Sequence, residues 1–365
     1  MPASPSGAAA RCTAPSGARS AGTSTTLKQL GLIERVPGER GVWRATAKGR
    51  KGEELTPAPA KVVMLGFSTD LGLALWGDCV DVFTRIDEPI HLCLTSPPYP
   101  LAQPRAYGNP TEAQYSDFIC RMMEPIVKNL VAGGSICINI SNDIFLKGSP
   151  ARSLYRERLV IALHERLGLW KMDEFIWHDN SKAPGPIAWA SKERFQLNVA
   201  WEPVYWFTND PVRVRSDNRR VLQPHSERHL KLIAQGGVAR TGSYGDGANN
   251  LKPGAFGRPT DGKIPKNVFQ IAHRCPSQFE LRKELQAQGL PMHGATMPAR
   301  LARFLIEFLT EKGDLVADTC SGWATTAKEA EETGRRWIVS EKMLEYVRGS
   351  QHRFVSAPGF ASALT

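Results

Sequence analysis

The stretch DLVADTCSGWATTAKEAEETGRRWIVSE, residues 314–341, decides the fold class of this chain. Residues 314–319 form an apolar run that enters a turn, which is typical of a buried strand. Residues 325–334 are rich in helix formers and end at a glycine, and residues 337–341 form a second apolar run that ends in a carboxylate. A strand, a helix and a second strand in this order predict a βαβ unit.

The same alternation extends over most of the chain. Apolar residues at helical spacing predict three more helices, over 111–130, 151–168 and 297–313. Short apolar or alternating runs predict four more strands, over 91–95, 135–140, 175–177 and 204–207. Strands separated by helices predict an α/β fold with a parallel, doubly wound, Rossmann-like sheet.

A turn of mostly small residues joins the strand at 314–319 to the helix that follows it. Small side chains let the backbone approach a ligand at the N-terminus of that helix. Glu341 ends the next strand about 20 residues further on, where an acid in a βαβ unit binds ribose hydroxyls. The turn is not GxGxxG, so a dinucleotide is not implied, and the arrangement equally suits another nucleoside ligand. A purely structural turn is the alternative.

A second candidate site is TSPPY, residues 95–99, directly after the strand at 91–95. Its two prolines fix the backbone and remove two N–H donors, so carbonyl groups face outward from a rigid loop. Tyr99 is expected to stack on a planar ring. Ser96 and a proline carbonyl are expected to accept hydrogen bonds from an exocyclic amino group of that ring. A proline-rich turn with a packing tyrosine is the alternative.

Together the two segments resemble the β-class of amino-methyltransferases that act on DNA. This class is circularly permuted: the catalytic loop comes first, the target-recognition region follows, and the S-adenosyl-L-methionine loop comes last. The same order occurs here, with TSPPY at 95–99 and DTCSGWATT at 318–326. The likeness runs from about residue 70 to 354, through stretches that match a cytosine-N4-specific member: SPPYPLAQPRAYGN (96–109), KGSPARSLY (147–155), NSKAPGPIAW (180–189), IPKNVFQI (264–271) and HGATMPARL (293–301).

The resemblance implies a role for each matching position. The catalytic loop comprises Ser96, Pro97, Pro98 and Tyr99. Serine at the first position is mainly a cytosine-N4 signature, whereas aspartate there is mainly an adenine-N6 signature. Glu341 is expected to bind the ribose of S-adenosyl-L-methionine, and Asp78 to lie near its adenine. The other positions implied to bind this cofactor are Asp318, Thr319, Cys320, Ser321, Gly322, Thr325, Met297 and Pro298.

The cofactor turn departs from the usual family pattern, Asp-x-Phe-x-Gly-Ser-x-Thr-Thr. Cys320 replaces the aromatic residue, Ser321 a small glycine-type position and Trp323 a small residue. The indole of Trp323 is expected either to point outward or to weaken cofactor binding. Two alternatives to cytosine-N4 methylation therefore stay open: adenine-N6 methylation, and a catalytically silent DNA-binding protein on the same fold.

Strand–helix alternation stops between residues 209 and 270. Residues 210–270 hold eleven Lys and Arg against five Asp and Glu, a net charge of +6. Such a surface suits a polyanion, and the resemblance makes it the irregular target-recognition insert for double-stranded DNA, with a solvated basic loop as the alternative. The cations available for phosphate or guanine contacts are Arg213, Arg215, Arg219, Arg220, Arg228, Lys231, Arg240, Arg258, Lys263 and Lys266.

The composition agrees with a globular protein that binds nucleic acid. The chain has 365 residues, 42% of them hydrophobic, and a net charge of +10. No apolar run approaches the roughly 18–20 residues that span a bilayer, and the N-terminus lacks a signal-peptide pattern, so a cytoplasmic protein is expected. Seven scattered cysteines include no CxxC pair, so neither a disulfide framework nor a metal site is expected, and most of them are expected in the core.

These segments divide the chain into six parts. Residues 1–26 are expected to be a disordered tail, and residues 27–60 a winged-helix-like remnant with a linker. Within that remnant we expect a helix end at Leu27–Leu30 and two short strands around Pro37–Gly38; a truncated gene and an isolated hairpin are the alternatives. The remaining parts are a catalytic half (61–208), the target-recognition region (209–270), a cofactor-binding half (271–354) and a tail (355–365). By resemblance, a cognate restriction endonuclease shares the site, and the oligomeric state stays open.

Overall fold

The computed structural model describes residues 33–35, 43–45, 55–101, 105, 107–244, 249–273, 276–294 and 296–364. The chain forms two compact units, Met1–Glu54 and Leu55–Thr365. In the first unit, strands β1 (Ile33–Arg35) and β2 (Trp43–Ala45) pair antiparallel. They are the two short strands expected around Pro37–Gly38. The expected tail at 1–26 and helix end at Leu27–Leu30 lie outside the described residues.

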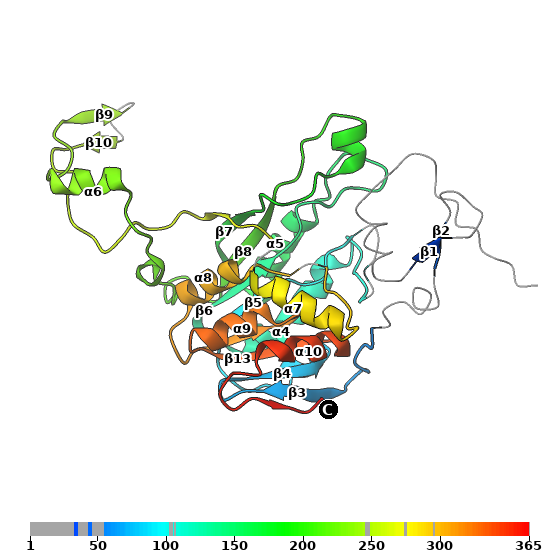
Figure 1. The fold of residues 1–365 in the computed structure, drawn as a ribbon. Helices are drawn as coiled ribbons and strands as arrows, with labels where there is room; N and C mark the ends of the chain where they lie inside the picture. Colours follow the sequence, from blue (N-terminus) through cyan, green and yellow to red (C-terminus); the bar gives the residue numbers. More distant parts are fainter. Residues whose placement is uncertain are drawn as a thin grey trace, which may run out of the picture. The chain divides into compact units, whose positions relative to one another are not determined.

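The second unit is built on one sheet of ten strands, in the spatial order β11-β7-β8-β6-β5-β12-β13-β4-β3-β14 (Figure 1). In chain order these are β3 (Val63–Ser68), β4 (Gly72–Gly77), β5 (Ile90–Thr95), β6 (Leu130–Asn139), β7 (Trp170–His178), β8 (Trp201–Thr208), β11 (Val268–Gln270), β12 (Leu315–Asp318), β13 (Arg336–Glu341) and β14 (Ala361–Ser362). The helices are α3 (Cys79–Phe83), α4 (Tyr115–Asn129), α5 (Tyr155–Leu167), α6 (Glu227–Ala234), α7 (Pro276–Ala287), α8 (Ala299–Leu309), α9 (Thr325–Glu332) and α10 (Leu344–Ser350).

The sheet is mixed, and the prediction of a parallel sheet is wrong for β8 and β3. Strands β6, β5, β12, β13 and β4 run parallel in the centre. Strand β8 is antiparallel to both β6 and β7, and β3 is antiparallel to β4. The physical reason is the connection, because a parallel neighbour needs a long crossover, usually a helix. Residues 179–200, all of them described, hold the short π-helix Ile187–Lys192 and no α-helix, and β8 returns antiparallel.

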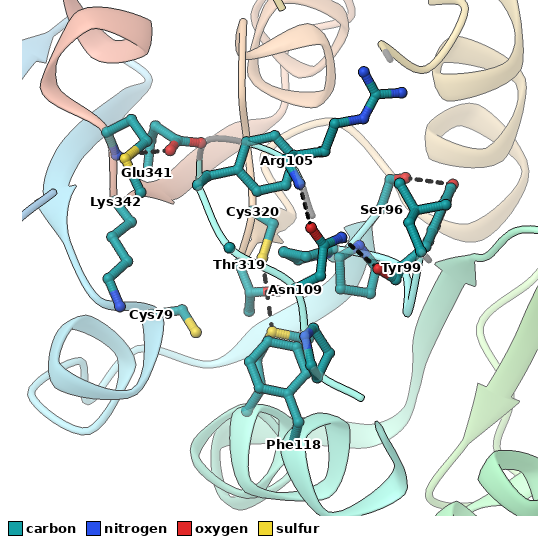
Figure 2. Close-up of a pocket in the computed structure, with 18 of the residues that line it drawn as sticks. Cys79, Ser96, Tyr99, Arg105, Asn109, Phe118, Thr319, Cys320, Glu341 and Lys342 are labelled. Atoms are coloured by element: carbon teal, nitrogen blue, oxygen red, sulfur yellow. Dashed lines mark hydrogen bonds between the residues drawn. The ribbon is translucent and has the colours of Figure 1, made fainter. Parts of the chain in front are cut away.

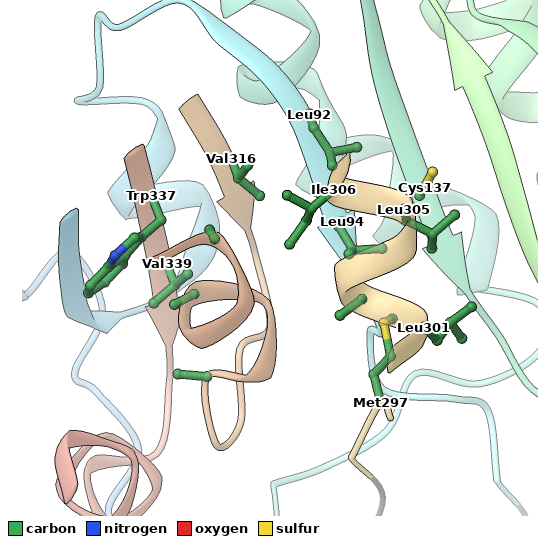
Figure 3. Close-up of a cluster of buried hydrophobic side chains, with 14 of the residues drawn as sticks. Leu92, Leu94, Cys137, Met297, Leu301, Leu305, Ile306, Val316, Trp337 and Val339 are labelled. Atoms are coloured by element: carbon green, nitrogen blue, oxygen red, sulfur yellow. The ribbon is translucent and has the colours of Figure 1, made fainter. Parts of the chain in front are cut away.

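Two apolar layers cover the sheet, one on each face. Successive residues of β5 alternate between them: Leu92 and Leu94 join one buried cluster, and Cys93 joins the other. The first cluster includes α8 and α9, and the second includes α3, α4 and α5. On α8, the apolar stripe of Leu301, Leu305, Ile306 and Leu309 faces the strands, as Figure 3 shows for the first three. The chain therefore forms the three-layer α/β architecture that the sequence predicts.

The central strands show the consequence of the permuted order. Strand β5 and strand β12 are more than 200 residues apart in sequence, yet they pair in parallel, with Cys93 opposite Ala317. The loops that follow them therefore leave the same edge of the sheet. This pairing brings the two candidate segments of the sequence together.

Strand β6 starts earlier than expected and runs through two glycines. At Gly133 the backbone φ is +73°, and a Cβ atom would lie 1.8 Å from the carbonyl oxygen of Arg213. Only glycine lets the start of the 209–270 segment pass this close to the strand. That segment also contains more regular structure than expected: helix α6, capped by Ser226, and a hairpin of β9 (Gly242–Tyr244) and β10 (Asn249–Leu251).

Five cysteines lie within the described residues, and all are free thiols. Cys93, Cys120 and Cys137 are buried, which confirms their expected place in the core. Cys12 and Cys275 lie outside the described residues. In the parts of the chain that the structure describes, no helix is long and apolar enough to span a bilayer.

Candidate active site

A cavity of about 490 Å³ opens where β5, β12 and β13 end (Figure 2). The two segments singled out in the sequence meet there. Ser96, Pro97, Pro98 and Tyr99 from the first, and Thr319, Cys320 and Glu341 from the second, all line it. Their strands are linked at the base of the cavity, because Thr319 Oγ1 donates a hydrogen bond to Thr95 Oγ1 across 3.0 Å. The volume suits a ligand of nucleoside size.

The catalytic loop is held by a buried amide. Tyr99 OH donates to Oδ1 of Asn139 at 3.1 Å, and Ser96 Oγ lies 3.0 Å from the same phenol and 3.4 Å from the same amide oxygen. Asn139 is held in turn, because its Nδ2 donates to the carbonyl of Pro203 at 3.2 Å. Burial, and then the charge of Glu202, raise the pKa of Tyr99 well above its usual value, so the phenol stays protonated and its single hydrogen is a donor.

This network fixes the role of the Ser96 hydroxyl. With the Tyr99 hydrogen directed at Asn139, the Ser96 hydrogen has two protein acceptors, the Tyr99 oxygen and Asn139 Oδ1. A hydroxyl has one hydrogen and two acceptor lone pairs. Toward the cavity, Ser96 Oγ is therefore an acceptor. This is the polarity that an exocyclic amino group requires.

Residues that the sequence analysis did not single out hold the other side of the catalytic loop. Asn109 Nδ2 donates to the carbonyl of Tyr99 at 2.5 Å, and its own oxygen accepts the backbone N–H of Arg105 at 2.5 Å. Tyr107 and His293 face the same cavity with parallel rings, 6.2 Å between centroids. Asn109 stands in the stretch 96–109 that carries the family resemblance, and that stretch was the signal that could have identified it.

The opposite part of the cavity is acidic. Glu341 ends β13, and its two oxygens accept the backbone N–H groups of Gly322 and Met343, each at 2.8 Å. Burial raises the pKa of this carboxyl to about 7, against the opposing effect of those two hydrogen bonds. Asp78 also lines the cavity; it caps α3 through the N–H of Val80 and pairs with Lys342 Nζ at 3.1 Å.

Several predicted cofactor positions support the cavity without lining it. Asp318 lies beneath the turn, where its Oδ1 accepts the N–H of Cys320 at 3.0 Å, and burial raises its pKa to about 6. Ser321 and Gly322 donate their backbone N–H groups to Ser340 and Glu341. Thr325 begins α9 and accepts a hydrogen bond from Arg353 at 3.1 Å. Met297 and Pro298 are buried at the start of α8, outside the lining.

Trp323 neither points outward nor enters the cavity. Its side chain is 1% exposed and packs in a separate cluster with Leu281, Leu285, Met343 and Tyr346. It is not among the residues that line the cavity. The bulky residue in the turn therefore does not block the ligand, which removes the structural argument for a catalytically silent protein.

The ten predicted DNA-binding cations fall into two groups. Four are held in ion pairs by acidic residues of the chain itself: Arg213 by Asp210, Arg215 by Asp314, Arg219 by Asp217 and Arg220 by Glu311. The other six are exposed and form no ion pair with a described residue: Arg228, Lys231, Arg240, Arg258, Lys263 and Lys266. Three of these six, and helix α6, belong to the part of the insert between residues 227 and 240.

The structure also brings together polar groups that lie far apart in sequence. Asn139 comes from β6, Glu202 from β8 and Lys182 from the loop after β7, and all three stand at the catalytic loop. Asn139 and Glu202 interrupt apolar strand patterns, which is a signal that sequence analysis can detect. Groups of His, Cys, Asp or Glu able to hold a metal ion are absent from the described parts of the chain.

Comparison with known proteins identifies a family and two relatives that this chain resembles. Residues 90–352 match the family described as DNA methylase. The chain is 32% identical over 290 residues to the Type II methyltransferase M.PvuII of Proteus hauseri, an alignment that covers 79% of this chain and 85% of that protein. A second relative, the Type II methyltransferase M.BamHI of Bacillus amyloliquefaciens, is 23% identical over 280 residues, covering 74% of this chain and 55% of that protein.

A solved structure has the same fold. The PvuII DNA methyltransferase, described as cytosine-N4-specific, superposes with a TM-score of 0.63 at 29% sequence identity. The superposition covers 79% of this chain and 88% of that protein.

Proposed function

The chain belongs to the DNA methylase family, and on this basis we propose that it transfers a methyl group from S-adenosyl-L-methionine to the N4 amino group of cytosine in duplex DNA. The resemblance and the enzyme class predicted from the sequence are confirmed. The observation that carries the choice of an amino group is the acceptor polarity of Ser96, which lines the cavity beside Tyr99 and is held by the buried Asn139.

The residues of the acidic part of the cavity fit the cofactor. Each oxygen of Glu341 uses one lone pair on a backbone N–H, so lone pairs remain for the two hydroxyls of a ribose. Asp78 adds a second acid, and Phe118 and Met122 give the lining an apolar portion for a flat base. Carboxylates at this end also suit a positively charged ligand. Thr319 and Cys320 complete the lining between this part and the catalytic loop.

When bound, S-adenosyl-L-methionine supplies a methyl group that its sulfonium sulfur makes electrophilic. The lone pair of a cytosine amino nitrogen is delocalised into the ring, so the protein has to orient and polarise that nitrogen. Ser96 Oγ and the Pro97 carbonyl accept its two hydrogens, which localises the lone pair, and Tyr99 covers the ring. Positioning of this kind accounts for large rate gains without a covalent enzyme–base adduct.

The amino group is inaccessible inside a duplex, so the cytosine has to flip into the cavity at a cost of a few kcal/mol. The six exposed cations of the insert, which form no ion pair with a described residue, are suited to the phosphates of the surrounding DNA. As part of the same proposal, the enzyme acts on DNA in the cytoplasm and protects a site that a cognate restriction endonuclease cuts. Adenine-N6 methylation is the second candidate, since the family includes both reactions by resemblance.

The test combines cofactor binding with product analysis. Calorimetric titration with S-adenosyl-L-methionine is expected to show one site, and nucleoside analysis of DNA treated with the enzyme is expected to show N4-methylcytosine. Ser96→Ala should lose the product and keep cofactor binding, whereas Ser356→Ala, at an exposed position outside the cavity, should keep both. Finding N6-methyladenine without N4-methylcytosine, or cofactor binding without any methylated base, would overturn the proposal.

A further inference from the structure

An ion pair stands beside the catalytic loop. Lys182 Nζ lies 3.1 Å from Glu202 Oε1, and both side chains line the cavity while only 22% and 18% exposed. The other oxygen of Glu202 lies 3.4 Å from Tyr99 OH. A chain of contacts therefore runs from Ser96 through Tyr99 and Glu202 to the ammonium of Lys182.

The backbone holds Lys182 at this place. It follows β7 in a short turn, in which its N–H donates to the carbonyl of Asp179 at 3.3 Å. Asp179 is fixed by its own N–H, which donates to Ala200 at 2.9 Å, and by its carboxylate, which accepts from Ser181. Glu202 lies on β8, opposite Trp177 of β7. The pair thus links β8 to the hydrogen-bonded turn that follows β7.

The ammonium has more donors than the protein uses. A lysine ammonium carries three N–H donors, and among the described residues Glu202 is the acceptor bonded to it. A charged group that is mostly removed from water is costly unless its donors find partners. The cavity that Lys182 lines is also lined by the catalytic loop and by Ser141 and Asp143. The arrangement therefore suits a ligand with an oxygen or nitrogen atom that accepts a hydrogen bond from Lys182.

Cytosine and adenine differ in the hydrogen-bond acceptors that they offer to such a donor. On its pairing edge, cytosine carries the N4 amino donor, the N3 acceptor and the O2 carbonyl acceptor, in that order. Adenine carries the N6 amino donor and the N1 acceptor, but a C–H group where cytosine has O2. A donor placed beyond the amino-group acceptor can therefore separate the two bases, because a missing hydrogen-bond partner is penalised strongly in a buried site.

We propose that Lys182 donates a hydrogen bond to the O2 carbonyl of the flipped cytosine and so selects cytosine over adenine. The two ends of the base then match the two ends of the contact chain: the amino group lies at Ser96 and the carbonyl at Lys182. Glu202 is the positioning residue, which holds the ammonium in place. This inference rests on the proposed function, because it identifies how the same site reads its substrate.

Single-molecule sequencing first identifies the DNA site that the wild-type enzyme methylates. The test then compares two duplexes that carry this site. One duplex has the target cytosine, and the other has an abasic site at that position; dissociation constants are measured with S-adenosyl-L-homocysteine present. Lys182→Met is expected to weaken binding to the cytosine duplex about tenfold and binding to the abasic duplex less than about twofold. Lys171→Met breaks the 2.9 Å pair with Glu174 on β7, outside the cavity, and is the matched control that should change neither.

A second measurement addresses selectivity. The ratio of kcat/KM for the target cytosine to kcat/KM for an adenine at the same position should fall about tenfold in Lys182→Met and stay constant in Lys171→Met. Equal weakening on cytosine and abasic duplexes, or an unchanged ratio, would show that the pair only holds β7 and β8 together and would overturn the inference alone. A wild-type product of N6-methyladenine would instead overturn the proposed function, and the inference with it.

Discussion

The backbone N–H of Gly322 donates a hydrogen bond of 2.8 Å to Oε2 of Glu341. Gly322 lies in the turn between β12 and α9, and Glu341 ends β13, the strand on the other side of that helix. The carboxylate expected to bind ribose is therefore also the group that closes the turn. The conformation of the turn and the charge of the cavity are coupled through one side chain.

This coupling predicts that cofactor affinity depends on pH. The pKa of Glu341 is raised to about 7, so the carboxyl is protonated below pH 7 and ionised above it. Hydroxyl donors bind the ionised form better, so affinity for S-adenosyl-L-methionine should rise between pH 6 and pH 8, by at most about tenfold per pH unit below 7. Calorimetric titrations at pH 6, 7 and 8 measure this rise.

Glu341→Gln should weaken cofactor binding roughly ten- to a hundredfold at pH 8, because a hydrogen bond to a charged group is lost. It should also flatten the pH dependence. Glu88→Gln, which changes a surface carboxylate paired with Arg336, is the control that keeps the wild-type profile. A Glu341→Gln protein with the wild-type slope would assign the pH dependence to another group.

Asp318 predicts an effect on stability that does not require a ligand. Its pKa is about 6 in the folded protein against 3.8 as the ordinary value, so folding favours the protonated form. The cost of ionising it is absent below pH 4, grows as pH rises to 6, and then stays at up to about 3 kcal/mol. The free energy of unfolding of Asp318→Asn relative to wild type should therefore increase between pH 4 and pH 7.

Denaturant unfolding at several pH values measures that difference. Asp87→Asn, at an exposed position, is the matched control, and its difference from wild type should stay constant over the same range. If the difference in the free energy of unfolding between Asp318→Asn and wild type does not change with pH, the folded protein does not hold this proton more tightly than the unfolded chain.

Tyr99→Phe isolates the phenol hydroxyl. The ring that covers the base remains, but Asn139 Oδ1 loses a donor at 3.1 Å and Ser96 loses its partner at 3.0 Å. The Ser96 hydrogen keeps only one protein acceptor, Asn139 Oδ1 at 3.4 Å, so Ser96 is held less firmly as an acceptor toward the cavity. We therefore expect kcat to fall at least about tenfold, while the dissociation constant for S-adenosyl-L-methionine changes less than about threefold. Single-turnover methylation and calorimetry test the two halves separately. A matching loss of cofactor affinity would contradict the assignment of Tyr99 to the base-binding end.

The ion pairs of the insert predict which cations contact DNA. Lys231 on α6 is exposed and forms no ion pair with a described residue, whereas the guanidinium of Arg219 pairs with Asp217 at 2.6 Å. Lys231→Ala should reduce the slope of log affinity against log salt by about 0.9, the value for one phosphate contact. Arg219→Ala, in the same insert, should change the slope much less. Equal slopes for both variants and the wild type would remove α6 from the interface.

Local pattern was sufficient for the elements around the cofactor turn. Residues 314–341 contain β12, α9 and β13 within a few residues of the expected bounds, because a buried strand and an amphipathic helix each show their own period. The position of the Trp323 side chain could not be predicted in the same way. Its direction depends on α7 and α10, which supply the cluster that buries it.

The directions of the strands could not be predicted from the local pattern either. The pattern of β7 and β8 identifies them as strands, but their antiparallel pairing follows from the connection between them and from β6, which β8 joins. The cavity depends on this pairing, since Asn139 lies opposite Val204 in the ladder of β6 and β8. Glu202 lies two residues before Val204 and so reaches the same site.

The sequence by itself determined the segments that are expected to carry the chemistry: TSPPY at 95–99, the turn at 318–326, the acid at 341 and the basic insert. It could do so because these groups are contiguous or follow a strand at a fixed interval. Only the tertiary structure decided which distant side chains join them, including Asn139, Lys182 and Glu202. Hydrogen bonds act over about 3 Å, and residues 40 and 103 positions apart come close to that range only when strands pair side by side.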